Sequence, residues 1–183
     1  PYMTHFTSAP AAAPYHLTRT EDYEQFCSFL DFGGARNTQN LFQWLLVQFL
    51  NESSLIWEKP RDLPWAALYY PGEECYLSLP AYSTKHLKPA VPIIAIAFPR
   101  DWWLWQNTEA IDELIRAVEK DGANALAFFS HYRSDPAKKI PGFEENIHTF
   151  CFQNGSCIAQ SLINCLFFSL TVGRPLEDPD LLA

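Results

Sequence analysis

The sequence predicts an α/β or α+β fold, in which an N-terminal helix pair is followed by a mixed sheet and a C-terminal helix. Helical periodicity dominates residues 18–50, whereas short apolar runs bounded by Pro and Gly dominate residues 54–98. Residues 92–133 then read as strand, helix and strand, which favours a right-handed β-α-β crossover with one parallel strand pair.

The first expected helix begins at Thr18, where Glu21 completes a capping box, and ends at the glycine pair 33–34. Its apolar stripe has the spacing i, i+3, i+4, i+7 and consists of Tyr23, Phe26, Cys27 and Leu30. The second expected helix begins near Thr38 and runs to Leu50. Because it is apolar around most of its circumference, we expect it to be central.

The expected strands are short and are separated by Pro and Gly: 54–58, 66–70, 75–79, 92–98, 124–132 and 147–153. The run from Ile93 to Phe98 is apolar on both faces, which is typical of a strand covered by helices on each side. Thr108 caps an amphipathic helix that ends before Gly122, and a last apolar helix is expected over 158–170.

The expected domain organisation is simple. A chain of 183 residues predicts a single globular domain, here 18–173. We expect residues 1–17, rich in Ala and Pro, to form an extended or disordered arm, and residues 174–183 to form a solvated tail.

Composition narrows the class of partner and the compartment. The formal charge is −8, from 21 acidic and 13 basic residues, which disfavours nucleic acid and suits a basic protein partner. Five scattered cysteines predict reduced thiols in an intracellular, cytoplasmic protein. The helix expected at 158–170 is too short and too polar for a membrane span, so no membrane partner is expected. No metal motif and no Gly-rich phosphate loop occurs, so we expect no metal and no cofactor.

Cys157 is the residue best suited to covalent chemistry. Asn154-Gly155 predicts a tight turn, and Ser156 is a good N-cap, so Cys157 is expected in the first turn of the last helix. A helix N-terminus stabilises a thiolate, which makes such a cysteine reactive. The alternative is that Cys157 fills the core as a small apolar side chain, as free cysteines commonly do.

The stretch from Gln153 to Cys157, followed by an apolar helix, resembles the nucleophile segment of papain-like and SUMO-protease-like cysteine proteases. The resemblance implies that Cys157 is the nucleophile and that Gln153 helps to build the oxyanion hole. In the SUMO-protease order, His86 and Asp101 would complete the catalytic set. The other candidate bases are His148 and His131.

The segment "FPRDWWLWQN" at 98–107 is the candidate partner-binding surface. Its candidate residues are Trp102, Trp103 and Trp105, flanked by Arg100 and Asp101, and Trp and Arg dominate interface hot spots. The alternative is that the three indoles seal the end of the sheet beneath the next helix.

Two functions of different classes follow from these patterns. The first is a non-catalytic, acidic protein-binding domain, such as an inhibitor or immunity-type protein that neutralises a partner enzyme or toxin. The second is a cysteine-dependent hydrolase that uses Cys157. Binding of a small apolar ligand by the aromatic surface is a third hypothesis.

Overall fold

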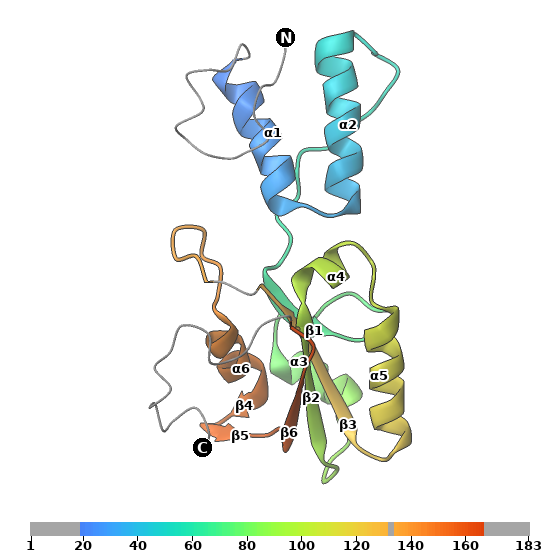
Figure 1. Cartoon of the computed structure of the whole chain (residues 1–183), viewed down its shortest axis with the longest axis vertical. Helices are drawn as coiled ribbons and strands as arrows, with labels where there is room; N and C mark the ends of the chain where they lie inside the picture. Colours follow the sequence, from blue (N-terminus) through green and yellow to red (C-terminus); the bar gives the residue numbers. More distant parts are fainter. Residues whose placement is uncertain (1–18, 132–133, 167–183) are drawn as a thin grey trace. The chain divides into compact units, whose positions relative to one another are not determined.

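A computed structural model of the chain describes residues 19–131 and 134–166 (Figure 1). The chain divides into two compact units, Pro1–Pro64 and Trp65–Ala183. The expected arm at 1–17 and the expected tail at 174–183 lie outside the described residues.

The first unit contains the expected helix pair, α1 (Thr20–Phe32) and α2 (Ala35–Leu50). Gly33 and Gly34 join the two helices with φ values of 64° and 84°, a backbone region that glycine adopts without a steric penalty. This turn lets α2 begin at Ala35 instead of near Thr38. The helices bury a shared aromatic core formed by Phe26, Phe29, Leu41 and Trp44.

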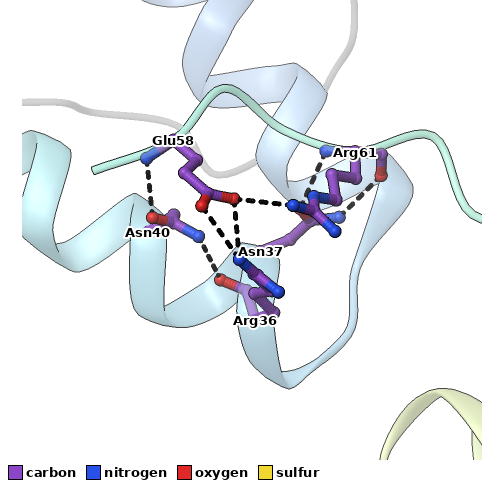
Figure 2. Close-up of polar contacts among 5 residues, drawn as sticks. All are labelled: Arg36, Asn37, Asn40, Glu58 and Arg61. Atoms are coloured by element: carbon purple, nitrogen blue, oxygen red, sulfur yellow. Dashed lines mark hydrogen bonds and ion pairs between the residues drawn. The ribbon is translucent and has the colours of Figure 1, made fainter.

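The expected strand at 54–58 is not a strand, because side chains of α2 bind the backbone that follows it. Asn37 accepts a hydrogen bond from the Arg61 N–H at 2.9 Å and donates one to the Arg61 carbonyl at 2.9 Å. Asn40 accepts a hydrogen bond from the Glu58 N–H at 2.7 Å. Figure 2 shows these contacts together with the exposed ion pairs that join Glu58 to Arg36 and Arg61. The loop therefore satisfies its backbone through asparagines rather than through a sheet.

The second unit is built on a four-stranded sheet with the order β1-β3-β2-β6. Its strands are β1 (Ala66–Tyr69), β2 (Ile93–Pro99), β3 (Asn124–Ser130) and β6 (Ser161–Asn164). β2 is parallel to both β3 and β6, whereas β1 is antiparallel to β3. The expected mixed α/β sheet and its parallel β-α-β unit are confirmed.

Helices cover both faces of this sheet (Figure 1). One face packs against α4 (Arg100–Leu104) and α5 (Glu109–Lys120), and the other against α3 (Leu79–His86) and α6 (Phe143–Cys151). Successive strand residues alternate between the two cores: Phe128 faces the α6 side, while Phe129 faces the α5 side. The expectation that the run ending at Phe98 is covered on both sides is confirmed.

The connection between β1 and β2 differs from the expected strand at 75–79. Only Tyr76 pairs with β1, through a bridge to Leu68. Pro80 then stands in the first turn of α3, where a missing N–H costs nothing, so the chain turns helical.

Two C-terminal segments have a different secondary structure from the one expected: the first is mostly helical and the second contains a strand. The segment 147–153, expected as a strand, is mostly helix α6, because Phe143, Ile147 and Phe150 follow a helical spacing toward the core. The segment 158–170, expected as a helix, contains no helix in its described part and instead forms strand β6 at Ser161–Asn164, which pairs with β2 from Ile94↔Ser161 to Ala97↔Asn164. Backbone pairing with a central strand outweighs the helical pattern here. The last residues of that expected helix lie outside the described part of the chain.

Candidate functional site

The carboxyl ends of β2 and β3 meet at one edge of the sheet, because Pro99 pairs with Ser130 in parallel register. Open α/β sheets bind ligands at this edge. The beginning of β1 lies at the same edge, since Ala66 also pairs with Ser130. The side chains that meet there are called the carboxyl-edge cluster below: Trp65, Arg100, Ser130, His131 and Asn146.

Arg100 and Trp65 form the centre of the cluster. Arg100 begins α4 directly after β2, and only 3% of the residue is exposed. Its guanidinium carbon lies 4.1 Å from the centroid of the Trp65 ring, within the range of a cation–π contact. The His131 ring meets Trp65 at 5.6 Å between centroids and an interplanar angle of 82°. The segments after β2 and after β3 thus converge on the indole that precedes β1.

A buried hydrogen-bond chain fixes the end of β3. Asn146, on α6, donates from Nδ2 to Ser130 Oγ at 2.8 Å, and Ser130 Oγ donates to the His131 carbonyl at 2.8 Å. Asn146 is 2% exposed and Ser130 is 1% exposed. Both polar side chains are therefore used to hold the backbone that carries His131.

The cluster brings together three kinds of side chain that are suited to ligand binding. An arginine is charged at all relevant pH values and presents a planar fork that suits a carboxylate or phosphate. The half-buried Trp65 ring suits a flat aromatic group, and the half-buried His131 imidazole has ring nitrogens that can donate or accept a proton. Among residues 19–131 and 134–166, no group of three or more His, Cys, Asp or Glu side chains could hold a metal ion.

His86 lies in a second polar cluster at the amino edge of the sheet. Its Nε2 is 3.2 Å from Glu73 Oε2 and 3.2 Å from the Tyr76 hydroxyl, and its ring stacks on Tyr70 at 3.9 Å. Lys85 Nζ donates to Glu73 Oε2 at 2.7 Å. The hydrogen bond from Lys85, followed by that from Tyr76, lowers the pKa of Glu73 to about 2. These contacts join the turn after β1 to the end of α3.

The structure does not assemble the set His86, Asp101 and Cys157. His86 faces Glu73 at the amino edge, whereas Asp101 follows β2 at the carboxyl edge. Cys157 ends the two-residue strand β5 (Ser156–Cys157), so it is not at a helix N-terminus. It is exposed, and its thiol donates to the Ala159 carbonyl at 3.4 Å, so it is not a core residue either.

The other residues expected around the nucleophile are also dispersed. β4 (Phe152–Gln153) pairs with β5 so that Phe152 opposes Cys157, which places Gln153 on the opposite face of the hairpin. His148 is exposed on α6, and its ring contacts Phe152 at 4.7 Å. Cys151 is buried, and that burial raises the pKa of its thiol to about 12. His131 instead belongs to the carboxyl-edge cluster.

The tryptophan segment divides between core and surface. Trp103 stacks on Phe129 at 4.3 Å with an interplanar angle of 13°, and Trp102 packs against the same core. Trp105 is 52% exposed, and Asp101 is exposed beside it on α4. Two of the three indoles therefore seal the end of the sheet, and one faces outward.

Trp65 and Asn146 are the site residues that the sequence analysis missed. Trp65 directly precedes a strand that runs antiparallel to its neighbour, and strand direction is not visible in the sequence. Asn146 had a usable signal, because it is a polar residue on the apolar face that Phe143 and Phe150 define at helical spacing.

Fold and site together define an α/β protein with a cationic and aromatic cluster at the carboxyl edge of its sheet, the edge where open α/β sheets bind ligands. The family model of CobN/magnesium chelatase matches residues 27–180. An uncharacterised protein of Methanocaldococcus jannaschii is 31% identical over 154 residues, which are 81% of this chain and 12% of that protein. The chain belongs to the CobN/magnesium chelatase family, because the family model covers most of its length.

A solved structure, the catalytic subunit of cobaltochelatase from Mycobacterium tuberculosis, matches with a TM-score of 0.48 and 18% identity. The match covers 73% of this chain and 10% of that one. A TM-score below 0.5 does not establish a common fold, so the family assignment rests on the sequence. This chain spans about 12% of the length of the curated relative that it matches.

Membership in this family corrects the functions expected from composition and from the cysteine segment. The chain is neither an inhibitor nor an immunity-type protein, and the hydrolase that uses Cys157 is also wrong. The family is named for enzymes, so the chain is enzyme-related, contrary to the expectation of a non-catalytic protein. Among the described residues, no helix has both the length and the apolar character required to span a membrane.

Proposed function

We propose that this chain contributes to ligand binding in a chelatase-type enzyme, and that the carboxyl-edge cluster holds the chelating ligand. A chelatase, as its name states, places a metal ion in a chelating ligand. The observation that carries the proposal is the buried Arg100 guanidinium, 4.1 Å from the Trp65 ring centroid, at the edge where α/β sheets bind ligands.

The cluster favours a flat, unsaturated chelator that bears acidic groups. The Trp65 ring has the Arg100 guanidinium over one face and would present the other face to a planar ligand, while Arg100 would supply a positive charge for a carboxylate. Buried Asn146 and Ser130 hold the end of β3, so the site is preorganised before the ligand arrives.

His131 has a separate role in this proposal. When a metal ion replaces the acidic protons of a chelator, those protons leave as the metal–ligand bonds form. An imidazole beside the ligand has a ring nitrogen that can accept such a proton. The His131 ring meets Trp65 at 5.6 Å, so a ligand that rests on the indole would also reach the imidazole.

The proposal concerns ligand binding and not the complete reaction. The chain spans about 12% of its curated relative, so the remainder of a full-length enzyme would supply the other groups that the reaction requires.

Binding of a water-soluble porphyrin tetracarboxylate, chosen as a flat acidic chelator, tests the proposal. The porphyrin absorbance band would be followed as protein is added to the wild type, to Trp65→Leu and to Arg100→Lys. The last variant keeps the charge but loses the planar fork. We expect at least about ten-fold weaker binding for both variants, from the loss of stacking and of a charge-assisted hydrogen bond.

Trp105→Leu is the matched control, since it removes an exposed indole outside the cluster. The tetramethyl ester of the same porphyrin would test the role of the carboxylates. If Trp65→Leu and Arg100→Lys keep a native circular dichroism spectrum and bind the tetracarboxylate as the wild type does, the proposed site is wrong.

A further inference from the structure

Trp105 has an exposed indole ring and lies on a turn that backbone hydrogen bonds hold in place. The backbone N–H of Trp105 donates to the Asp101 carbonyl at 3.0 Å, that of Gln106 to the Trp103 carbonyl at 3.1 Å, and that of Asn107 to the Trp102 carbonyl at 2.7 Å. Gln106 adopts a φ of 58°, which ends the helical turn. These bonds hold the backbone that carries the outward-facing ring, so little conformational freedom is lost when a partner binds it.

Two exposed carboxylates lie within four residues of Trp105 in the sequence, Asp101 before it and Glu109 after it. Asp101 and Glu109 are exposed and lie in the first turns of α4 and α5, and within residues 19–131 and 134–166 neither forms an ion pair. Arg100, next in sequence, is instead buried against Trp65. α5 has two exposed cations: Arg116 pairs with Glu113, and Lys120 lies in the last turn of the helix, at the opposite end from Glu109.

We propose that Trp105, Asp101 and Glu109, called the Trp105 corner, form a docking surface for an arginine-bearing segment of a partner protein. A guanidinium stacks on an indole face and pairs with carboxylates through its planar fork, so arginine matches both features at once. The formal charge of −8 draws a basic partner toward this surface. This inference concerns assembly with another protein and does not depend on the chelating ligand.

The corner is distinct from the tryptophans that fill the core. Trp102 and Trp103 are partly buried against the sheet, whereas Trp105 is 52% exposed. The exposed apolar face of α2, which includes Phe42 and Leu50, carries no comparable charge to specify what would cover it.

The probe for this surface is acetyl-tetra-arginine amide, titrated into the ¹⁵N-labelled chain. The indole N–H signal of Trp105, assigned by its loss in Trp105→Phe, should shift with saturation. Trp105→Ala should weaken binding by about three-fold, which is the size of an exposed cation–π contact. The double variant Asp101→Asn/Glu109→Gln should weaken it by about five-fold through two lost charge pairs.

A charge-matched control separates this site from general electrostatic attraction. Glu21→Gln/Glu24→Gln removes the same number of charges from α1, in the other unit, and should leave the affinity within about two-fold of the wild type. Equal weakening by both double variants, an unmoved Trp105 indole signal, or no saturable binding would each overturn the proposal.

Discussion

The buried pair Asn146 and Ser130 offers a quantitative test of the carboxyl-edge cluster. Ser130→Ala removes the acceptor of the 2.8 Å bond from Asn146 and leaves a buried amide N–H without a partner. An unsatisfied buried donor costs about 1–3 kcal/mol, in addition to the lost bond from Ser130 to the His131 carbonyl at about 1 kcal/mol. We therefore expect Ser130→Ala to lower the free energy of unfolding by about 2–4 kcal/mol.

A double-mutant cycle isolates the pair itself. Asn146→Ala removes the donor together with a buried side chain, and it should cost about 2 kcal/mol. The double variant should lose about 1–2 kcal/mol less than the sum of the two single losses, because no orphaned N–H remains.

Urea unfolding followed by circular dichroism measures all four proteins, and hydrogen exchange of the β3 amides reports on the second unit alone. Additive losses, with a coupling energy below about 0.3 kcal/mol, would refute the claim that this bond holds the end of β3.

Three further outcomes follow from the contacts described above. Asn37→Ala should increase hydrogen exchange at the Arg61 amide by about ten-fold or more, because that N–H loses its 2.9 Å acceptor. An unchanged exchange rate would contradict the claim that Asn37 holds the backbone of Arg61. The pKa of Glu73 is held at about 2, so its carboxylate stabilises the fold above its ordinary pKa of 4.5, and this contribution is lost as pH falls toward 2. Glu73→Gln should flatten the pH dependence of urea unfolding between pH 4.5 and 2, and parallel curves would count against this. In native protein at pH 8, iodoacetamide should label exposed Cys157 and spare buried Cys151, which peptide mass spectrometry can check; labelling of both at equal rates would contradict the described burial.

The central elements of the fold were predictable because their patterns are strong. The run from Ile93 to Phe98 is apolar on both faces, and the helix that follows Thr108 has a clear amphipathic stripe. Strand, helix and strand in that order leave few topologies, and the parallel pairing of β2 with β3 followed from a general rule of handedness.

The C-terminal segment was not predictable for two physical reasons. Phe150 and Phe152 alternate as in a strand, yet Phe150 also fits the helical spacing set by Phe143, and packing on the sheet decides between them. Ser161 to Asn164 lies in an apolar stretch that suits a helix, but the free edge of β2 offers backbone hydrogen bonds that only a strand can use. Tertiary contacts override local preference in both cases.

The candidate site was predictable only in part. Arg100 and His131 each follow an apolar strand. Because α/β sheets bind ligands at strand ends, the position of His131 after its strand made it a candidate site residue. Trp65 could not be found, because its place depends on the antiparallel direction of β1. Cys157 was predicted to be reactive because a helix N-terminus would stabilise its thiolate. Cys157 instead lies in the β4–β5 hairpin, so no helix dipole acts on it.

The direction of the edge strand β1 determines which aromatic residue lies at the carboxyl edge of the sheet. β1 is flanked by Trp65 before its first residue and Tyr70 after its last. Because β1 runs opposite to its neighbour, the indole meets Arg100, while the phenol stacks on His86 at the far end of the sheet. If β1 ran in the opposite direction, Tyr70 would take the place of Trp65 beside Arg100. The guanidinium would then meet a phenol with a weakly acidic hydroxyl instead of an indole.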